Sequence, residues 1–249
     1  MEQEETLLGW MRNRFKFIEG VGDYTRLCLD VAKVSIKKPP AFKLLLQQLY
    51  DVGVRDFAFY DDALLAGADT RLKVIMRELI KSGRRPRFHC PNGIHARFID
   101  DELACLMKRT GFTTLRLGLE TVNEDRQAAT GGKVSSACLE SAVKTLKRNG
   151  FTKEHIGVYL MYGLPGQGLS EVKDGIEFLK GLGVKVHLTE FSPIPGTSCW
   201  QELIGRGIIT DDTDPLLTNN TVFTYLFSGY DLEELEELKL TVKDFNSVL

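Results

Sequence analysis

Acidic, amide, glycine and proline residues recur in this sequence directly after short apolar runs, and these are the residues that could do chemistry. Asp61 and Asp62 follow one such run, and Glu120 follows another. Carboxylates at such positions suit the binding of an ammonium group or a divalent cation, or acid–base catalysis. The full set of candidate site residues is Asp61, Asp62, Asn92, Arg116, Glu120, Gly163, Pro165, Gly166, Glu190 and Pro193.

The elements that must position these residues alternate along the chain. Strands are predicted at 54–60, 87–90, 113–119, 156–162 and 184–191, and helices at 71–81, from 100 onward, 135–148, 170–182 and 231–245. A loop is predicted at 91–93. Five consecutive strand–helix units with short turns predict parallel strands joined by right-handed crossovers. The fold class expected is therefore α/β, an open, partial parallel β/α barrel with a C-terminal helix.

Three regions are expected from this pattern. Residues 1–50 form a divergent N-terminal segment with a helix at 7–17 and a candidate strand at 29–36. Residues 51–200 form the partial barrel, and residues 201–249 form an extension that ends in the closing helix.

The third strand shows why a polar cavity is expected. Period-two alternation puts Arg116, Gly118 and Glu120 on one face, with three leucines toward the helices. Inward charges need a partner or a polar cavity, and parallel barrels bind ligands at the carboxyl ends of their strands. Simpler interpretations stay open: an internal Arg116–Glu120 salt bridge, a helix cap at Asp62, and a plain tight turn at 163–166.

Composition narrows the class of protein. The 249 residues carry a net charge of −2, with 43% hydrophobic and 27% charged residues, so a general nucleic-acid binder is not expected. No apolar run is long enough for a membrane span, and the acidic N-terminus does not resemble a signal peptide. The five cysteines are widely dispersed along the sequence, which fits reduced thiols in a reducing compartment. The four histidines lack metal-ligand spacing. A cytoplasmic protein without a metal site of its own is expected.

Six segments between residues 54 and 200 resemble, in order, the radical S-adenosylmethionine (SAM) superfamily, in particular the branch often coupled to cobalamin-binding domains. They are FAFYDDALL, HCPNGIHARFIDDELACLMKRTGF, LRLGLET, TGGKVS, GVYLMYGLPGQ and EFSPIPGTSCW.

The resemblance implies a role for each matched position. Asp61 and Asp62 would contact the amino group of SAM, and Glu120 its amino-acid or ribose part. Arg116 would pair with the SAM carboxylate. The segment 163–166 would lie against the adenosine. Glu190 and Pro193 would lie beside the adenine. Asn92 is placed with them by its position at a predicted strand end, because the carboxyl ends of the strands form one rim.

One family feature is missing from the sequence. Family members carry a Cys-x-x-x-Cys-x-x-Cys loop after the first strand, whose thiolates hold a [4Fe-4S] cluster. Here Lys37-Lys38-Pro39-Pro40 stand in that place, Cys28 is the nearest thiol, and Cys90 belongs to a different strand. The chain is therefore expected to form no radical by itself, and no catalytic residue is assigned.

Several interpretations follow. The chain is a truncated remnant, a degenerate paralogue that keeps part of a SAM site, or one piece of a split enzyme whose partner supplies the cluster domain. Two other classes stay open: an acid–base or divalent-cation enzyme built on Asp61, Asp62, Glu120 and Glu190, and a non-enzymatic interaction module that uses the apolar segment 216–227. The sequence does not identify a substrate.

Overall fold

The computed structural model describes residues 48–61, 63–129 and 134–248. The chain divides into two compact units, residues 1–53 and 54–249. Within the first unit, residues 48–53 are described, and residues 48–51 are helical. The predictions for 7–17, 29–36, Lys37–Pro40, Cys28 and Asp62 lie outside the described residues.

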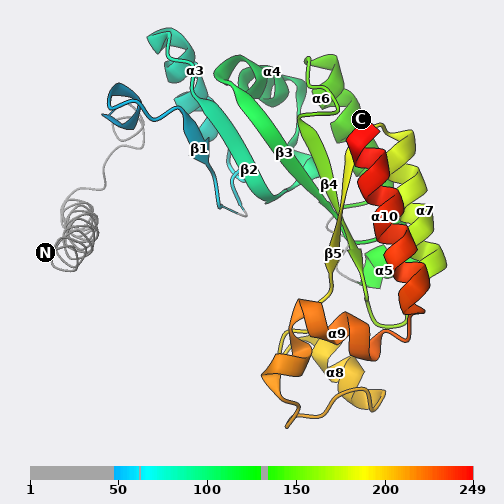
Figure 1. Cartoon of the computed structure of the whole chain (residues 1–249). Helices are drawn as coiled ribbons and strands as arrows, with labels where there is room; N and C mark the ends of the chain where they lie inside the picture. The colour runs from blue at the N-terminus through cyan, green and yellow to red at the C-terminus, as the bar shows by residue number, and fades with distance from the viewer. Residues whose placement is uncertain (1–47, 62, 130–133, 249) are drawn as a thin grey trace, which may run out of the picture. The chain divides into compact units, whose positions relative to one another are not determined.

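The described part of the second unit is built on a five-stranded parallel sheet in the order β1-β2-β3-β4-β5 (Figure 1). The strands are β1 (Asp56–Ala58), β2 (Arg87–Ile94), β3 (Phe112–Leu119), β4 (Ile156–Tyr162) and β5 (Lys185–Glu190). Strands that follow one another in the chain are neighbours in the sheet, so the predicted α/β open barrel with parallel strands is confirmed.

The helices are α3 (Leu72–Ser82), α4 (Asp101–Thr110), α5 (Glu124–Ala129), α6 (Ser136–Arg148), α7 (Leu169–Gly181), α8 (Ser198–Gly205), α9 (Asn220–Phe227) and α10 (Leu232–Val248), with short 3-10 turns η1 (Ala96–Phe98) and η2 (Pro215–Thr218). Local chemistry sets several of their starts. Ser135 accepts a hydrogen bond from the Cys138 N–H at 3.2 Å and begins α6, and Asp100 does the same for α4 from the Leu103 N–H at 2.6 Å. Both are N-caps of the kind that serine and aspartate supply.

The prediction of a loop at Pro91–Gly93 is wrong, because these residues form a bulge inside β2. Cys90 pairs with Leu115 and Ile94 with Leu117, so four steps along β2 span only two along β3. The Tyr159 hydroxyl donates to the Pro91 carbonyl at 2.7 Å and supports the bulge from β4. Pairing with a neighbouring strand continues β2 across a segment that would otherwise turn.

Helices cover one face of the sheet, and its leucines are buried against them (Figure 1). Leu115 and Leu117 are fully buried and Leu119 is 2% exposed, as the alternation predicted. The opposite face carries Arg116 and Gly118, which are only partly buried, and is called the inner face below. Gly157 and Tyr159 of β4 and His187 of β5 share that face, because they align with β3 residues of the same parity.

The segment after β5 forms a small helical extension with its own core. Trp200 and Leu203 of α8 pack with Ile209 and with Phe223 of α9. Leu216, proposed from the sequence as a contact residue, is 72% exposed, whereas Phe223 from the same segment is buried. Part of the segment 216–227 therefore belongs to this core.

Helix α10 closes the β5 edge of the sheet. The Asn246 side-chain amide accepts from the Val186 N–H at 2.9 Å and donates to the Val186 carbonyl at 2.7 Å. Both backbone groups would otherwise belong to an unpaired strand edge. Lys173 of α7 also binds Glu234 of α10 at 2.6 Å.

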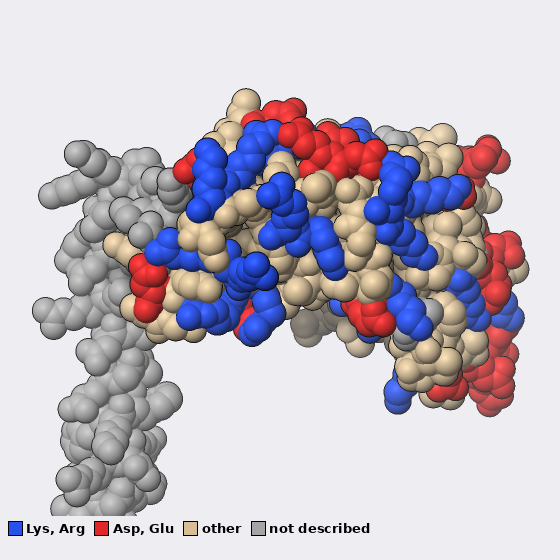
Figure 2. Space-filling view, turned by 90° about the horizontal axis from the view of Figure 1, so that it is seen from above, with Lys and Arg blue, Asp and Glu red and all other residues tan. Residues whose placement is uncertain are grey.

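The side of the molecule seen in Figure 2 carries many Lys and Arg side chains, with Asp and Glu gathered mainly toward its margins. A surface hollow of about 470 Å³ has basic residues in its lining: Arg84, Arg85, Lys108 and Arg109. These residues precede β2 and β3, so the hollow lies at the opposite ends of the strands from Glu120. Among the described helices, none is long and apolar enough to cross a membrane.

Candidate functional site

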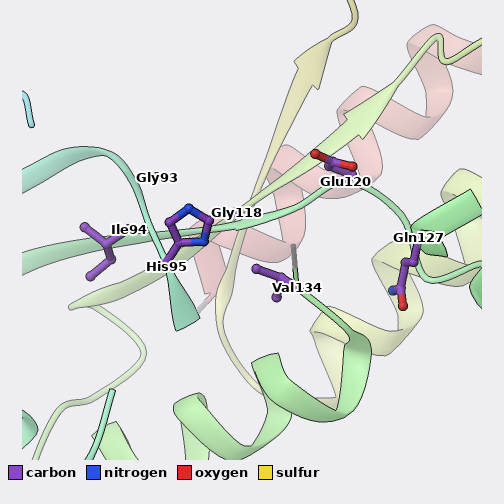
Figure 3. Close-up of a pocket in the computed structure, with 7 residues that line it drawn as sticks. All are labelled: Gly93, Ile94, His95, Gly118, Glu120, Gln127 and Val134. Carbon is purple, nitrogen blue, oxygen red and sulfur yellow. The ribbon is translucent and has the colours of Figure 1, made fainter. Parts of the chain in front are cut away.

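A cavity of about 100 Å³ opens at the carboxyl end of β3 on the inner face (Figure 3). Its lining residues are Gly93, Ile94, His95, Gly118, Glu120, Gln127 and Val134. The β2 bulge brings Gly93 against β3, because a Cβ on Gly93 would lie 3.6 Å from the Gly118 nitrogen. Two glycines facing each other thus leave room for a ligand beside the strand ends.

Glu120 is the one carboxylate in this lining. It is partly buried, and within the described residues it has no hydrogen bond or ion pair. The internal salt bridge to Arg116 that the sequence left open is not formed there; the guanidinium instead donates to the Leu115 carbonyl at 3.2 Å. A carboxylate in a cavity lining that has no described protein partner can accept hydrogen bonds from an ammonium or hydroxyl group of a ligand.

His95 and Gln127 were missed from the sequence. His95 follows the bulge and lines the cavity, with its ring edge-on to Phe98. Gln127 of α5 donates to the Thr121 carbonyl at 2.6 Å. A histidine two residues after Asn-Gly offered a weak signal, and α5 offered none, because six residues are too few for a periodic pattern.

The loop that follows β4 is held next to the end of β3 by a clamp between α5 and α7. Arg126 donates to the carbonyls of Pro165 at 2.7 Å and Gly166 at 3.1 Å, and to the Glu171 carboxylate at 3.0 Å. The Thr121 hydroxyl also donates to Glu171. The loop 163–166 is therefore a fixed wall rather than an isolated tight turn.

Gly163 begins this loop in a conformation that glycine favours. Its φ is +85°, and an added Cβ would lie 2.5 Å from the Thr224 hydroxyl oxygen. The Gly163 N–H donates to the Tyr230 hydroxyl at 3.0 Å. The helical extension thus packs directly against the loop, and only the absence of a side chain allows it.

Asp61 has a local contact in the structure, whereas Asn92 contacts a distant segment of the chain. The Asp61 carboxylate accepts from the Ala63 N–H at 2.9 Å, which is a turn contact. The Asn92 amide lies 3.5 Å from the Tyr60 carbonyl. Asn92 thus links the end of β2 to the segment after β1, where Asp61 also lies.

Glu190 lies on the other side of the sheet from Glu120. It pairs with Tyr162, whose hydroxyl donates to the Glu190 carboxylate at 2.6 Å. Tyr162 is fully buried, and burial together with the Glu190 charge raises its pKa. The sequence carried a signal for this placement. In a period-two strand Glu190 shares a face with Val184, Val186 and Leu188, which are apolar like the helix-facing residues of β4. Pro193 is buried directly after β5.

The described cysteines do not form a ligand set. Cys90 is 1% exposed, and burial raises the pKa of its thiol to about 12. Cys105, Cys138 and Cys199 lie on three different helices and are free. Within residues 48–61, 63–129 and 134–248, no three His, Cys, Asp or Glu side chains gather as metal ligands. The described cysteines do not fit a [4Fe-4S] cluster, which needs several thiolates close together. The Glu120 carboxylate, in contrast, suits the ammonium group of a small ligand.

This fold resembles that of several solved structures, among them two of one enzyme. Both are of the radical SAM methyltransferase TsrM from Kitasatospora setae, one with cobalamin and a [4Fe-4S] cluster bound (TM-score 0.53, 17% identity) and one with tryptophan substrate and the SAM analogue aza-SAM bound (TM-score 0.55, 16% identity). Each match covers 65% of this chain but only 30% and 32% of the TsrM chains. The matched part thus spans about a third of TsrM.

A third structure, coproporphyrinogen III oxidase (HemN) from Escherichia coli, a radical SAM enzyme, matches with a TM-score of 0.48 and 15% identity, over 80% of this chain and 47% of that one. No curated protein sequence matches the chain. The family model of the radical SAM superfamily matches residues 35–179, more than half of the sequence. The chain belongs to the radical SAM superfamily.

Proposed function

We propose that this chain keeps part of a SAM site at the carboxyl ends of its strands and forms no radical by itself. The observation that carries the first half is the Glu120 carboxylate, which lines a cavity and has no partner among the described residues. SAM presents an ammonium group and ribose hydroxyls, which are the donors that such a carboxylate binds.

The remaining parts of the proposed SAM site follow from the family assignment. Asp61 and Asn92 would approach the amino-acid end from the β1–β2 side. The loop 163–166, clamped by Arg126 and Glu171, would provide the wall for the adenosine. Pro193 stays in the proposed rim, and Glu190 does not, because it is bound to Tyr162 on the helix-covered face.

The second part of the proposal, that the chain forms no radical by itself, rests on its cysteines. The sequence contains no Cys-x-x-x-Cys-x-x-Cys motif, and the described cysteines do not gather. A chain that binds SAM without a cluster is either a degenerate relative or the SAM-binding piece of a split enzyme. In the second case, a partner protein would carry the cluster domain.

The test is SAM binding by calorimetry, supported by thermal shift. Wild-type protein is expected to bind SAM, and Glu120→Gln to bind it about tenfold to a hundredfold more weakly, since a charge-assisted hydrogen bond contributes about 1.5–3 kcal/mol. Glu190→Gln is the matched control and should bind like wild type. Absence of binding at millimolar SAM, or equal losses in both variants, would refute the proposed site.

The proposal that the chain forms no radical by itself has a separate test. Protein reconstituted with iron and sulfide without oxygen, then reduced with SAM present, is expected to yield no 5′-deoxyadenosine. A stoichiometric [4Fe-4S] spectrum together with 5′-deoxyadenosine would overturn this part of the proposal and would make Cys28 the first cluster ligand to test. No observation in the described residues favours the divalent-cation enzyme.

A further inference from the structure

A second polar cluster lies on the inner face, nearer the amino ends of the strands than Glu120. Arg116 of β3, Gly157 of β4 and Lys185 of β5 align in one row, and Tyr159 and His187 align in the next. Arg116 is four residues before Glu120, which along a strand is about 13 Å. The cluster is not part of the lining of the cavity at the end of β3, although Gly93 of that lining lies against Tyr159.

Gly157 allows two of these side chains to come together. A Cβ on Gly157 would lie 2.7 Å from His187 Nε2 and 2.9 Å from Arg116 Nη1. Both groups therefore reach over the same glycine from opposite sides, one from β3 and one from β5. Any other residue at position 157 would keep them apart.

The charge around this point is positive and lacks a described counterion. Within the described residues no carboxylate forms an ion pair with Arg116, whose guanidinium donates to the Leu115 carbonyl and also contacts the Tyr159 hydroxyl. His187 Nε2 is buried without a hydrogen-bond partner, an arrangement that is unfavourable unless a ligand supplies the partner. Burial, Arg116 and Lys185 lower the pKa of His187 to about 4, so the ring is neutral near pH 7 and its N–H can still donate.

A surface groove adjoins this cluster. Tyr159 and His187 also line a groove of about 560 Å³ along the edge strand β5, beside Lys239 and Lys243 of α10. The acid in that lining, Glu190, is already bound by Tyr162. Lys239 is already paired with Glu236 at 3.1 Å, so the positive charge available to an anion in this region comes from Arg116, Lys185 and Lys243.

We propose that Arg116 and His187, brought together over Gly157, bind a carboxylate or phosphate group of a small-molecule ligand on the inner face. The inference goes beyond the proposed SAM site, because it needs neither Glu120 nor a cluster. The anion is assigned to a second molecule, and the carboxylate of SAM is the alternative source that the experiment distinguishes.

The experiment follows the His187 ring by NMR in the full chain, with inorganic pyrophosphate as the probe and His187→Gln for assignment. Pyrophosphate is expected to raise the pKa of His187 by at least one pH unit, and Arg116→Gln to abolish the rise. Arg87→Gln, which removes an exposed arginine paired with Asp56, is the control and should leave the rise intact. Circular dichroism confirms that each variant is folded; if Arg116→Gln is not, calorimetry of pyrophosphate on His187→Gln replaces it, with at least a tenfold weaker affinity expected.

No change at His187 with pyrophosphate, or the same change in Arg116→Gln, would overturn the proposed site. SAM supplies the second arm. If SAM shifts the His187 signals and Arg116→Gln loses SAM binding, the anion is the SAM carboxylate, and the assignment to a second molecule is wrong. Loss of SAM binding in Glu120→Gln with an intact pyrophosphate response separates failure of one site from failure of the other.

Discussion

Substitution of Gly163 by alanine is expected to destabilise the protein by about 2–5 kcal/mol. Two physical effects contribute. The φ of +85° costs a residue with a Cβ about 1–2 kcal/mol. The new Cβ would also lie 2.5 Å from Thr224 Oγ1 and 2.9 Å from its Cγ2, an overpacking that costs about 1–3 kcal/mol.

A double mutant separates the two effects. Thr224→Ala removes both crowded atoms and leaves a Cβ 3.2 Å from the added methyl. The Thr224 hydroxyl is buried without a hydrogen-bond partner, so its loss costs little beyond a small cavity. Gly163→Ala/Thr224→Ala is therefore expected to be more stable than the sum of the single losses by about 1–3 kcal/mol, with the backbone cost remaining.

Urea unfolding at 25 °C measures these differences. With a slope of about 3 kcal/mol per molar, a loss of 3 kcal/mol lowers the midpoint by about 1 M. Gly205→Ala is the control, because Gly205 has no positive φ and nothing within 4 Å of an added Cβ; it should be neutral or slightly stabilising. Additivity of the two single mutants within about 0.5 kcal/mol would refute the steric argument.

Three further outcomes are expected. Lys73→Met should cost about 1–3 kcal/mol by thermal unfolding, since Lys73 is 4% exposed and joins Asp69, Asp100 and Glu102; an unchanged midpoint would contradict this. Because the pKa of His187 is depressed in the folded state to about 4, the unfolded chain takes up the proton first, and stability should fall between pH 6.5 and 4 by about 1–2 kcal/mol after solvent screening. His187→Gln should flatten that part of the profile, and an identical profile would count against it. Asn246→Leu should speed amide exchange at Val186, because the Val186 N–H then loses its acceptor at the strand edge; unchanged exchange there would contradict the edge-capping role.

Local sequence chemistry determined much of the fold. The run 156–162 is β4 as predicted, and Ser135 begins α6, because alternation and side-chain capping act within a few residues. The same alternation put Arg116 and Gly118 opposite the buried leucines. The domain limits and the roles of individual site residues stay predictions.

The tertiary structure decided the features that depend on contact between distant segments. The β2 bulge exists because Cys90 and Ile94 pair with particular residues of β3. Register alone sets Gly157 between Arg116 and His187, and Arg126 meets the loop after β4 only through folding of a six-residue helix. Sequence periodicity fixes which face a side chain occupies, but pairing across strands fixes its neighbours, and those neighbours decide what the site can bind.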